Sequence, residues 1–444
     1  MDFNSKSALK RLNKKTLSSE WREFRRSFEN FWCCRSQKSS HGSHSLRNHR
    51  KEEKRVYKFG DLQAPDPFTT DFSVTPENAL AMDVFHSVLQ SSSNPDENTA
   101  FSPHGMKTAL AAILPGTDGN LHAALTQFLC PDGTNYDAVA SSLKVVNLEA
   151  ALNCVNAVFY DNDSRFPVLP YLATAVDISF VRTPFRMSPD AAAFVMDRFV
   201  TEKTDGSLRN YHTEVPRDTG MILLNIEQIS PRWEMPFNPL LTKSRIFHCP
   251  NNVEKSVDFM HHELLTTRNF NVFECEDDNP QVVILDLAGR KFSVMIILPY
   301  WNSGGTEKLQ EKMTIGNLLA WRQKCVWRLP YQLQLFLPKF RIRCGVDLKS
   351  CATDIGLQQL FEESESAYRR MFESNAACKI DEFKQGISLE INELGEKPPL
   401  PLYNFSPALN WGGSFVADRP FFFVLWNETA NVPVVMGRIT DPSV

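Results

Sequence analysis

Helix-like and strand-like patterns occupy largely different parts of this chain, and that separation is what most constrains its fold. Apolar residues recur at helical spacing in the earlier part, in Asn78–Gln90, Pro103–Leu114 and Ala191–Glu202. Runs of strand length are concentrated later, and they are Asn153–Tyr160, Met221–Ile226, Val282–Leu287, Lys291–Leu298, Phe421–Trp426 and Val432–Met436. A doubly wound parallel sheet needs strands and helices to alternate, and little alternation is present. The sequence therefore predicts an α+β fold.

Composition and length leave room for one large domain. The chain has 444 residues, of which 42% are apolar and 23% charged, as in ordinary globular proteins. Length alone favours two or three domains, but no linker rich in Pro, Gly or Ser divides the chain after residue 80. We therefore expect one domain over 80–444, a linker at 61–79 and a separate arm at 1–60. The predicted core strands include Ala100–Pro103, Asn153–Tyr160, Leu333–Phe340 and Phe421–Met436.

The arm differs from the rest of the chain in charge. Residues 1–60 hold sixteen Lys and Arg against six Asp and Glu, which gives +10, so the remainder carries −14 of the total of −4. Within 19–32, an aromatic stripe that includes Trp21, Phe24 and Phe28 has helical spacing. One interpretation is a basic amphipathic helix that binds a membrane surface or a partner groove. The other is a disordered leader with a fortuitous stripe.

Several classes of protein lack support in the sequence. The ten cysteines include no C-x-x-C pair, and we expect reduced, packed thiols, no metal site and no cofactor. No G-x-S-x-G, H-E-x-x-H or P-loop motif occurs, so we expect no enzymatic activity, and we expect no nucleic-acid partner. No apolar run reaches 18 residues, and the first thirty residues lack the continuous apolar stretch of a signal peptide.

Short stretches along some 360 residues occur in the order of known signatures. These stretches are Asn98–Gly116, Leu152–Tyr160, Met196–Leu208, Asp218–Phe237, Leu337–Phe340, Ile355–Phe361, Phe415–Phe423 and Val435–Pro442. Together they resemble the serpins, the serine protease inhibitor superfamily. The resemblance implies three β-sheets, eight or nine helices and an exposed reactive-centre loop. In inhibitory members a protease cleaves that loop and is acylated, and the loop then inserts as a new central strand of the main sheet.

The loop itself departs from the inhibitory pattern. The resemblance starts it at Glu393 and Gly395, and its length places the bait bond at Leu409-Asn410. Small residues usually follow the glycine, but here the chain reads Glu396, Lys397, Pro398, Pro399, Leu400 and Pro401. Prolines cannot donate to a central ladder, and a buried carboxylate costs several kcal/mol. The hinge therefore predicts a loop that resists insertion.

The resemblance also marks residues that control how the main sheet opens. Ser102 and Asn225 match the family's shutter residues, and Trp233 matches the tryptophan at the top of the sheet. Gly105 stands where a second serine is usual, and Gln385 stands where a histidine is usual. The hydrogen-bond network that governs strand separation is therefore expected to be altered.

Three functions remain open at this point. The leading hypothesis is a non-inhibitory serpin with a binding, carrier or signalling role and an unidentified protein or small-ligand partner. The alternative is a serine protease inhibitor that uses Leu409 as bait, and the third is a precursor or adaptor acting through residues 1–60.

The sequons at Asn162, Asn404 and Asn427 matter only in a secreted protein. The family favours an extracellular location, whereas the missing leader leaves cytoplasmic and nuclear locations open. Lys144 alone is basic in 121–145, so we expect no heparin activation.

Overall fold

The structure is a computed structural model. It describes residues 75–91, 94, 96–131, 133–149, 152–162, 178–209, 215–264, 268–270, 272, 279–300, 305–327, 332–372, 377–394 and 411–443. The chain separates into two units, Met1–Pro65 and Asp66–Val444, and all described residues belong to the second. The predicted arm at 1–60 therefore lies outside the described residues.

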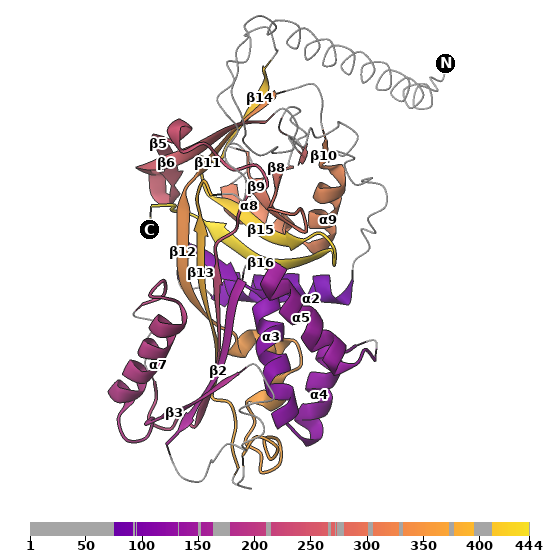
Figure 1. Ribbon diagram of the computed structural model, residues 1–444, viewed down its shortest axis with the longest axis vertical. Helices are drawn as coiled ribbons and strands as arrows, with labels where there is room; N and C mark the ends of the chain where they lie inside the picture. Colours follow the sequence, from indigo (N-terminus) through magenta and orange to yellow (C-terminus); the bar gives the residue numbers. More distant parts are fainter. Residues whose placement is uncertain are drawn as a thin grey trace, which may run out of the picture. The chain divides into compact units, whose positions relative to one another are not determined.

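Eight α-helices occur among the described residues (Figure 1). They are α2 (Pro76–Ser91), α3 (Pro103–Ile113), α4 (Gly119–Leu129), α5 (Tyr136–Glu149), α7 (Pro189–Lys203), α8 (Gly305–Lys312), α9 (Ile315–Lys324) and α10 (Lys349–Asp354). Short 3-10 helices are η2 (Leu114–Gly116), η3 (Pro239–Leu241), η4 (Pro250–Asn252) and η5 (Gln358–Leu360). Both α3 and α7 begin with a capping serine, Ser102 or Ser188, followed by proline, which is the arrangement expected at a helix start.

The largest sheet has seven strands and is antiparallel throughout. Its spatial order is β1 (Thr99–Phe101), β16 (Val432–Ile439), β15 (Phe421–Asn427), β9 (Phe292–Leu298), β8 (Gln281–Asp286), β7 (Arg268–Phe270) and β10 (Val326–Trp327). Strand β16 lies between β1 and β15, so segments from opposite ends of the domain are neighbours. The side chain of Asn98 accepts a hydrogen bond from the backbone N–H of Thr440, 342 residues away.

The central sheet has five strands. Its order is β12 (Phe340–Asp347), β13 (Glu382–Ile391), β4 (Met221–Ile229), β2 (Leu152–Asp161) and β3 (Ser179–Thr183). Strands β4 and β13 are parallel and pair directly from Ile222↔Glu382 to Ile229↔Leu389. We call the boundary between these two strands the seam. The seam is closed along its whole length, with no strand between β4 and β13.

Helices cover both faces of the central sheet (Figure 1). Alternate residues of β4 point to opposite sides, as strand geometry requires. Leu223 packs with α3, whereas Leu224 and Ile226 pack with α7. Strand β4, which forms one side of the seam, is therefore packed against a helix on each face.

The third sheet has four strands, in the order β14 (Trp411–Val416), β11 (Gln332–Pro338), β6 (Val253–Leu264) and β5 (Lys243–Cys249). Strand β14 is an edge strand and runs parallel to β11. The residues between β13 and β14 thus connect two different sheets.

The predicted α+β class with three sheets is confirmed, and two predicted strands need correction. Leu333–Phe340 is not one strand, because β11 ends at Pro338 and β12 begins at Phe340 in another sheet. Ala100–Pro103 is likewise shortened, because Pro103 opens α3. Helix α2 begins at Pro76, inside the stretch predicted as a linker at 61–79.

Candidate functional site

Four of the shutter residues named from sequence meet beneath the seam. The backbone N–H of Ser102 donates to Oε1 of Gln385 at 2.8 Å, and Nε2 of Gln385 donates to the Ser102 carbonyl at 3.0 Å. Nε2 also donates to Oδ1 of Asn225 at 2.9 Å, which joins β13 to β4 by a side-chain bond across the seam. Gly105 completes the group from the first turn of α3. Both polar side chains, Asn225 and Gln385, are fully buried.

The cluster extends beyond the seam in two directions. On β2, Asn156 accepts a bond from Nδ2 of Asn225 at 2.9 Å. At the start of α3, the Ser102 hydroxyl donates to the carbonyl of Val434 at 2.9 Å and accepts from the N–H of Gly105 at 2.8 Å. The helix cap therefore also ties the central sheet to β16. Opening the seam would therefore disturb a cluster that joins four strands, β2, β4, β13 and β16, to the start of α3.

The glycine at position 105 leaves space that polar side chains fill. A Cβ built there would lie 2.3 Å from Oδ1 of Asn225, 2.8 Å from Oε1 of Glu227 and 2.9 Å from Nε2 of Gln385. All three distances are below normal contact. The serine that the resemblance leads us to expect would not fit without rearrangement. The departures at Gly105 and Gln385 are therefore structurally coupled.

Glu227 is a member of this cluster that sequence reasoning missed. It is completely buried and lies on the same face of β4 as Asn225, toward α3. Burial raises the pKa of its carboxyl to about 7, although Ser102 and Cys154 oppose this in part. The available signal was an acidic residue inside the apolar run of Met221–Ile229.

Trp233 anchors the upper end of the seam. Its indole Nε1 donates to the carbonyl of Asn392 at 2.7 Å, and its backbone N–H donates to the carbonyl of Leu394 at 3.1 Å. Glu393 accepts a bond from the hydroxyl of Thr242 at 2.8 Å and pairs with Lys339 at 3.1 Å. Burial acts against it, but these partners hold the pKa of Glu393 below its ordinary value. The chain is thus fixed up to Leu394.

The predicted loop continues beyond the described residues. Gly395, Glu396, Lys397, Pro398, Pro399, Pro401, Asn404, Leu409 and Asn410 lie outside the described residues. Of the other sequons, Asn162 is exposed. Asn427 is only 6% exposed, and its Oδ1 accepts bonds from the N–H groups of Thr429 and Ala430 at 2.9 and 3.0 Å. That burial argues against a glycan on Asn427.

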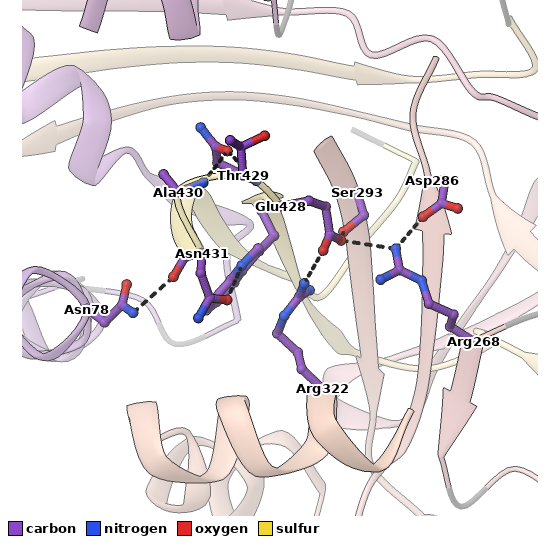
Figure 2. A network of polar contacts seen from close by, with 11 residues as sticks. Asn78, Arg268, Asp286, Ser293, Arg322, Glu428, Thr429, Ala430 and Asn431 are labelled. Carbon is purple, nitrogen blue, oxygen red and sulfur yellow. Dashed lines mark hydrogen bonds and ion pairs between the residues drawn. The ribbon is translucent and has the colours of Figure 1, made fainter. Parts of the chain in front are cut away.

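A second polar network supports the β15–β16 turn (Figure 2). Glu428 pairs with Nη2 of Arg322 at 2.8 Å and with Nη2 of Arg268 at 3.0 Å, and it accepts a bond from Ser293. Arg268 also pairs with Asp286. Burial opposes the effect, but the two arginines lower the pKa of Glu428 to about 2.

This network joins parts of the domain that are distant in sequence. The guanidinium of Arg322 lies 4.4 Å from the ring of Trp426, and Nδ2 of Asn78 on α2 donates to the carbonyl of Asn431 at 3.0 Å. Two arginines and two carboxylates balance in charge, which suits an anchoring role for the hairpin rather than chemistry on a substrate.

The described residues provide neither a metal centre nor a membrane-spanning helix. No group of three or more His, Cys, Asp or Glu side chains in the described ranges could hold a metal ion. Within the same ranges, no helix is long and apolar enough to cross a membrane.

Comparisons with known proteins agree with this architecture. The chain is 24% identical over 375 residues to Serpin B5 of Xenopus laevis, covering 82% of this chain and 95% of that protein. It is 23% identical over 368 residues to Serpin B9 of Homo sapiens, covering 79% and 94%. The crystal structure of uncleaved ovalbumin superposes with a TM-score of 0.68 at 20% identity, covering 82% of this chain and 98% of that one. The family model described as Serpin (serine protease inhibitor) matches residues 75–442, and the chain therefore belongs to the serpin family.

Proposed function

We propose that this serpin is non-inhibitory and acts through binding, as a carrier or in signalling, rather than by trapping a protease. The observation that carries the proposal is the sequence after Gly395, where Glu396 and three prolines replace the small residues expected in an insertable strand. Some relatives are named as protease inhibitors, such as the Protein Z-dependent protease inhibitor of Rattus norvegicus. A serine protease is therefore the partner to test.

Insertion would require the loop to form backbone hydrogen bonds with β4 on one side and with β13 on the other. The eight residue pairs that join β4 and β13 would have to separate, and each strand would pair with the loop instead. Pro398, Pro399 and Pro401 have no N–H to donate to either neighbour. Each carbonyl left without a partner costs roughly 1–3 kcal/mol. The three prolines therefore weaken the new ladder where it would begin.

The charge of Glu396 at the hinge also opposes insertion of the loop. An inserted Glu396 would bring an additional carboxylate into the closed sheet, and burying an unpaired carboxylate costs several kcal/mol. The residues before it would also have to leave their partners, because Trp233 holds Leu394 and Lys339 holds Glu393. Insertion must outrun deacylation of the trapped protease, so even a modest barrier defeats trapping.

Cleavage of the loop followed by thermal melting tests the proposal. We expect a chymotrypsin-like protease to cut near Leu409 and the nicked protein to melt within about 2–4 °C of the intact one, a shift of only about 1.5–3 kcal/mol in a domain of this size. We also expect no complex that survives a denaturing gel. A sharp rise in melting temperature after cleavage, or a denaturant-stable complex, would refute the proposal and establish the inhibitor.

A matched variant checks the cause. Replacing Glu396 by Thr and 397–401 by alanine removes the charge and the prolines together. This variant should gain part of the post-cleavage stabilisation, because only the hinge has changed. No gain would mean that the hinge is not what prevents insertion.

A further inference from the structure

The carboxyl group of Glu227 occupies the seam of the central sheet. Glu227 pairs with Cys154 of β2 on one side and with Ile387 of β13 on the other, so the three residues form one row across the strands. The side chain is completely buried beneath Gly105 of α3. It therefore lies where β4 and β13 would have to part.

Neither oxygen of Glu227 has a hydrogen-bond partner among the described residues. Nearby donors are already engaged. The Ser102 hydroxyl donates to the carbonyl of Val434, and Nδ2 of Asn225 donates to Asn156 and to the sulfur of Cys154. Nε2 of Gln385 donates to the Ser102 carbonyl and to Oδ1 of Asn225. The Ser102 hydroxyl and the Cys154 thiol favour the carboxylate only in part and do not offset its lost hydration, so burial disfavours the charged form.

A protonated Glu227 meets a more favourable environment. Its own O–H needs only an acceptor, and the Ser102 oxygen, which accepts one bond from the N–H of Gly105, has a second lone pair. The neutral acid therefore suits the closed cluster better than the anion does.

The titratable groups around Glu227 do not compensate for its charge. From β2 comes the thiol of Cys154 and from α3 the hydroxyl of Ser102, and these are the side chains that act on its pKa besides burial. His104 of α3 bonds instead to Asn147 at 2.6 Å, and burial lowers its pKa to about 4, so it stays neutral. Strand β13 contributes the neutral Gln385, and on β12 burial raises the pKa of Cys344 to about 11.

We propose that Glu227 makes opening of the central sheet proton-dependent: the protonated side chain favours the closed seam, and ionisation favours separation of β4 from β13. Opening admits water to the carboxyl group, so the open state prefers the anion. This device goes beyond the proposed function, because it concerns the sheet itself and holds whether or not the loop inserts.

The direction of the pH dependence follows from the carboxyl group. Its pKa is about 7 in the closed sheet against an ordinary value of 4.5. The contribution of Glu227 to closure of the seam is therefore complete below pH 4.5 and falls as the pH rises through 7. Above that it stays constant at its lower value. A shift of this size corresponds to a change of roughly 10²-fold in the ratio of closed to open sheet.

The test compares wild type with Glu227→Gln, which cannot ionise, from pH 4.5 to 8.5 at constant ionic strength. We expect the melting temperature of wild type to fall relative to the variant as the pH rises, and the difference to level off above pH 8. Amides of β4 and β13, corrected for intrinsic exchange rates, should exchange faster in wild type at pH 8, while those of β15 and β16 match. Glu307→Gln on α8, where Glu307 is exposed, serves as the control and should follow wild type throughout.

Two results would overturn the proposal. A difference in melting temperature that is the same at every pH would assign Glu227 a purely structural role. A pH-dependent difference without faster exchange in β4 and β13 would place the effect outside the seam. If Glu227→Gln does not fold, Glu227→Met carries the same comparison, because methionine is of similar length and also cannot ionise.

Discussion

Replacing Gly105 by alanine measures how tightly the cluster beneath the seam is packed. The added Cβ would lie 2.3 Å from Oδ1 of Asn225 and 2.9 Å from Nε2 of Gln385, two atoms that hydrogen-bond each other at 2.9 Å. Both amides must move. Overpacking of this kind costs about 1–3 kcal/mol, and weakening the buried bond adds about 0.5–1.5 kcal/mol. Alanine returns at most about 1 kcal/mol in helix propensity.

The net expectation for Gly105→Ala is therefore a loss of about 1–3 kcal/mol. Unfolding entropy of about 2.1 cal/mol/K per residue, over a domain of roughly 370 residues, converts this to a fall of about 1–4 °C in melting temperature by calorimetry. Gly316→Ala in the first turn of α9 is the matched control, since the nearest atom to its Cβ is Oγ1 of Thr314 at 4.0 Å. That control should melt at or slightly above wild type. If Gly105→Ala does the same, the cluster is looser than these distances require.

Two further predictions concern the other anchors of the domain. Glu428→Gln leaves Arg322 and Arg268 without their shared carboxylate and should cost about 3–5 kcal/mol in urea unfolding at pH 7. Because the pKa of Glu428 is about 2 when folded, against 4.5 ordinarily, its stabilisation of about 3 kcal/mol is present above pH 4.5 and is lost as the pH falls toward 2. The free energy of unfolding of the variant should fall less steeply below pH 4.5 than that of wild type. An equally steep fall would contradict the pairing. Trp233→Phe should cost about 1 kcal/mol by removing the bond to Asn392, whereas Trp233→Ala should cost about 3–5 kcal/mol, and no loss of stability in Trp233→Phe would argue against a role for that bond.

Sequence patterns found the strands that carry strong local signals. The apolar run of Lys291–Leu298 became β9, and the paired runs after Phe421 became the β15–β16 hairpin. The change of sheet at Lys339 was missed, because both flanking stretches have the same alternating pattern and nothing local marks a strand that leaves its sheet.

The residues of the candidate site were likewise found only in part from the sequence. Ser102, Asn225 and Gln385 were found through resemblance to the family, and the structure brings them together. Glu227 was missed because an acidic residue in a strand is normally turned to solvent, and only the packing of α3 buries it. The partners of Glu428 could not be inferred either, since 106 and 160 residues separate it from Arg322 and Arg268.

The position of β16 between β1 and β15 has a consequence for how this domain is made. Strand β1 emerges early in synthesis, yet β16, its partner among the described strands, arrives some 340 residues later, as the bond between Asn98 and Thr440 shows. Contacts between residues so far apart in sequence form slowly, because the entropy lost on closing the intervening chain is not offset until the contacts themselves have formed. Until then, apolar side chains of α3 such as Leu110, which share a core with Met436 of β16, lack part of their cover. The nascent domain thus passes through a prolonged, aggregation-prone stage in which chaperones can act.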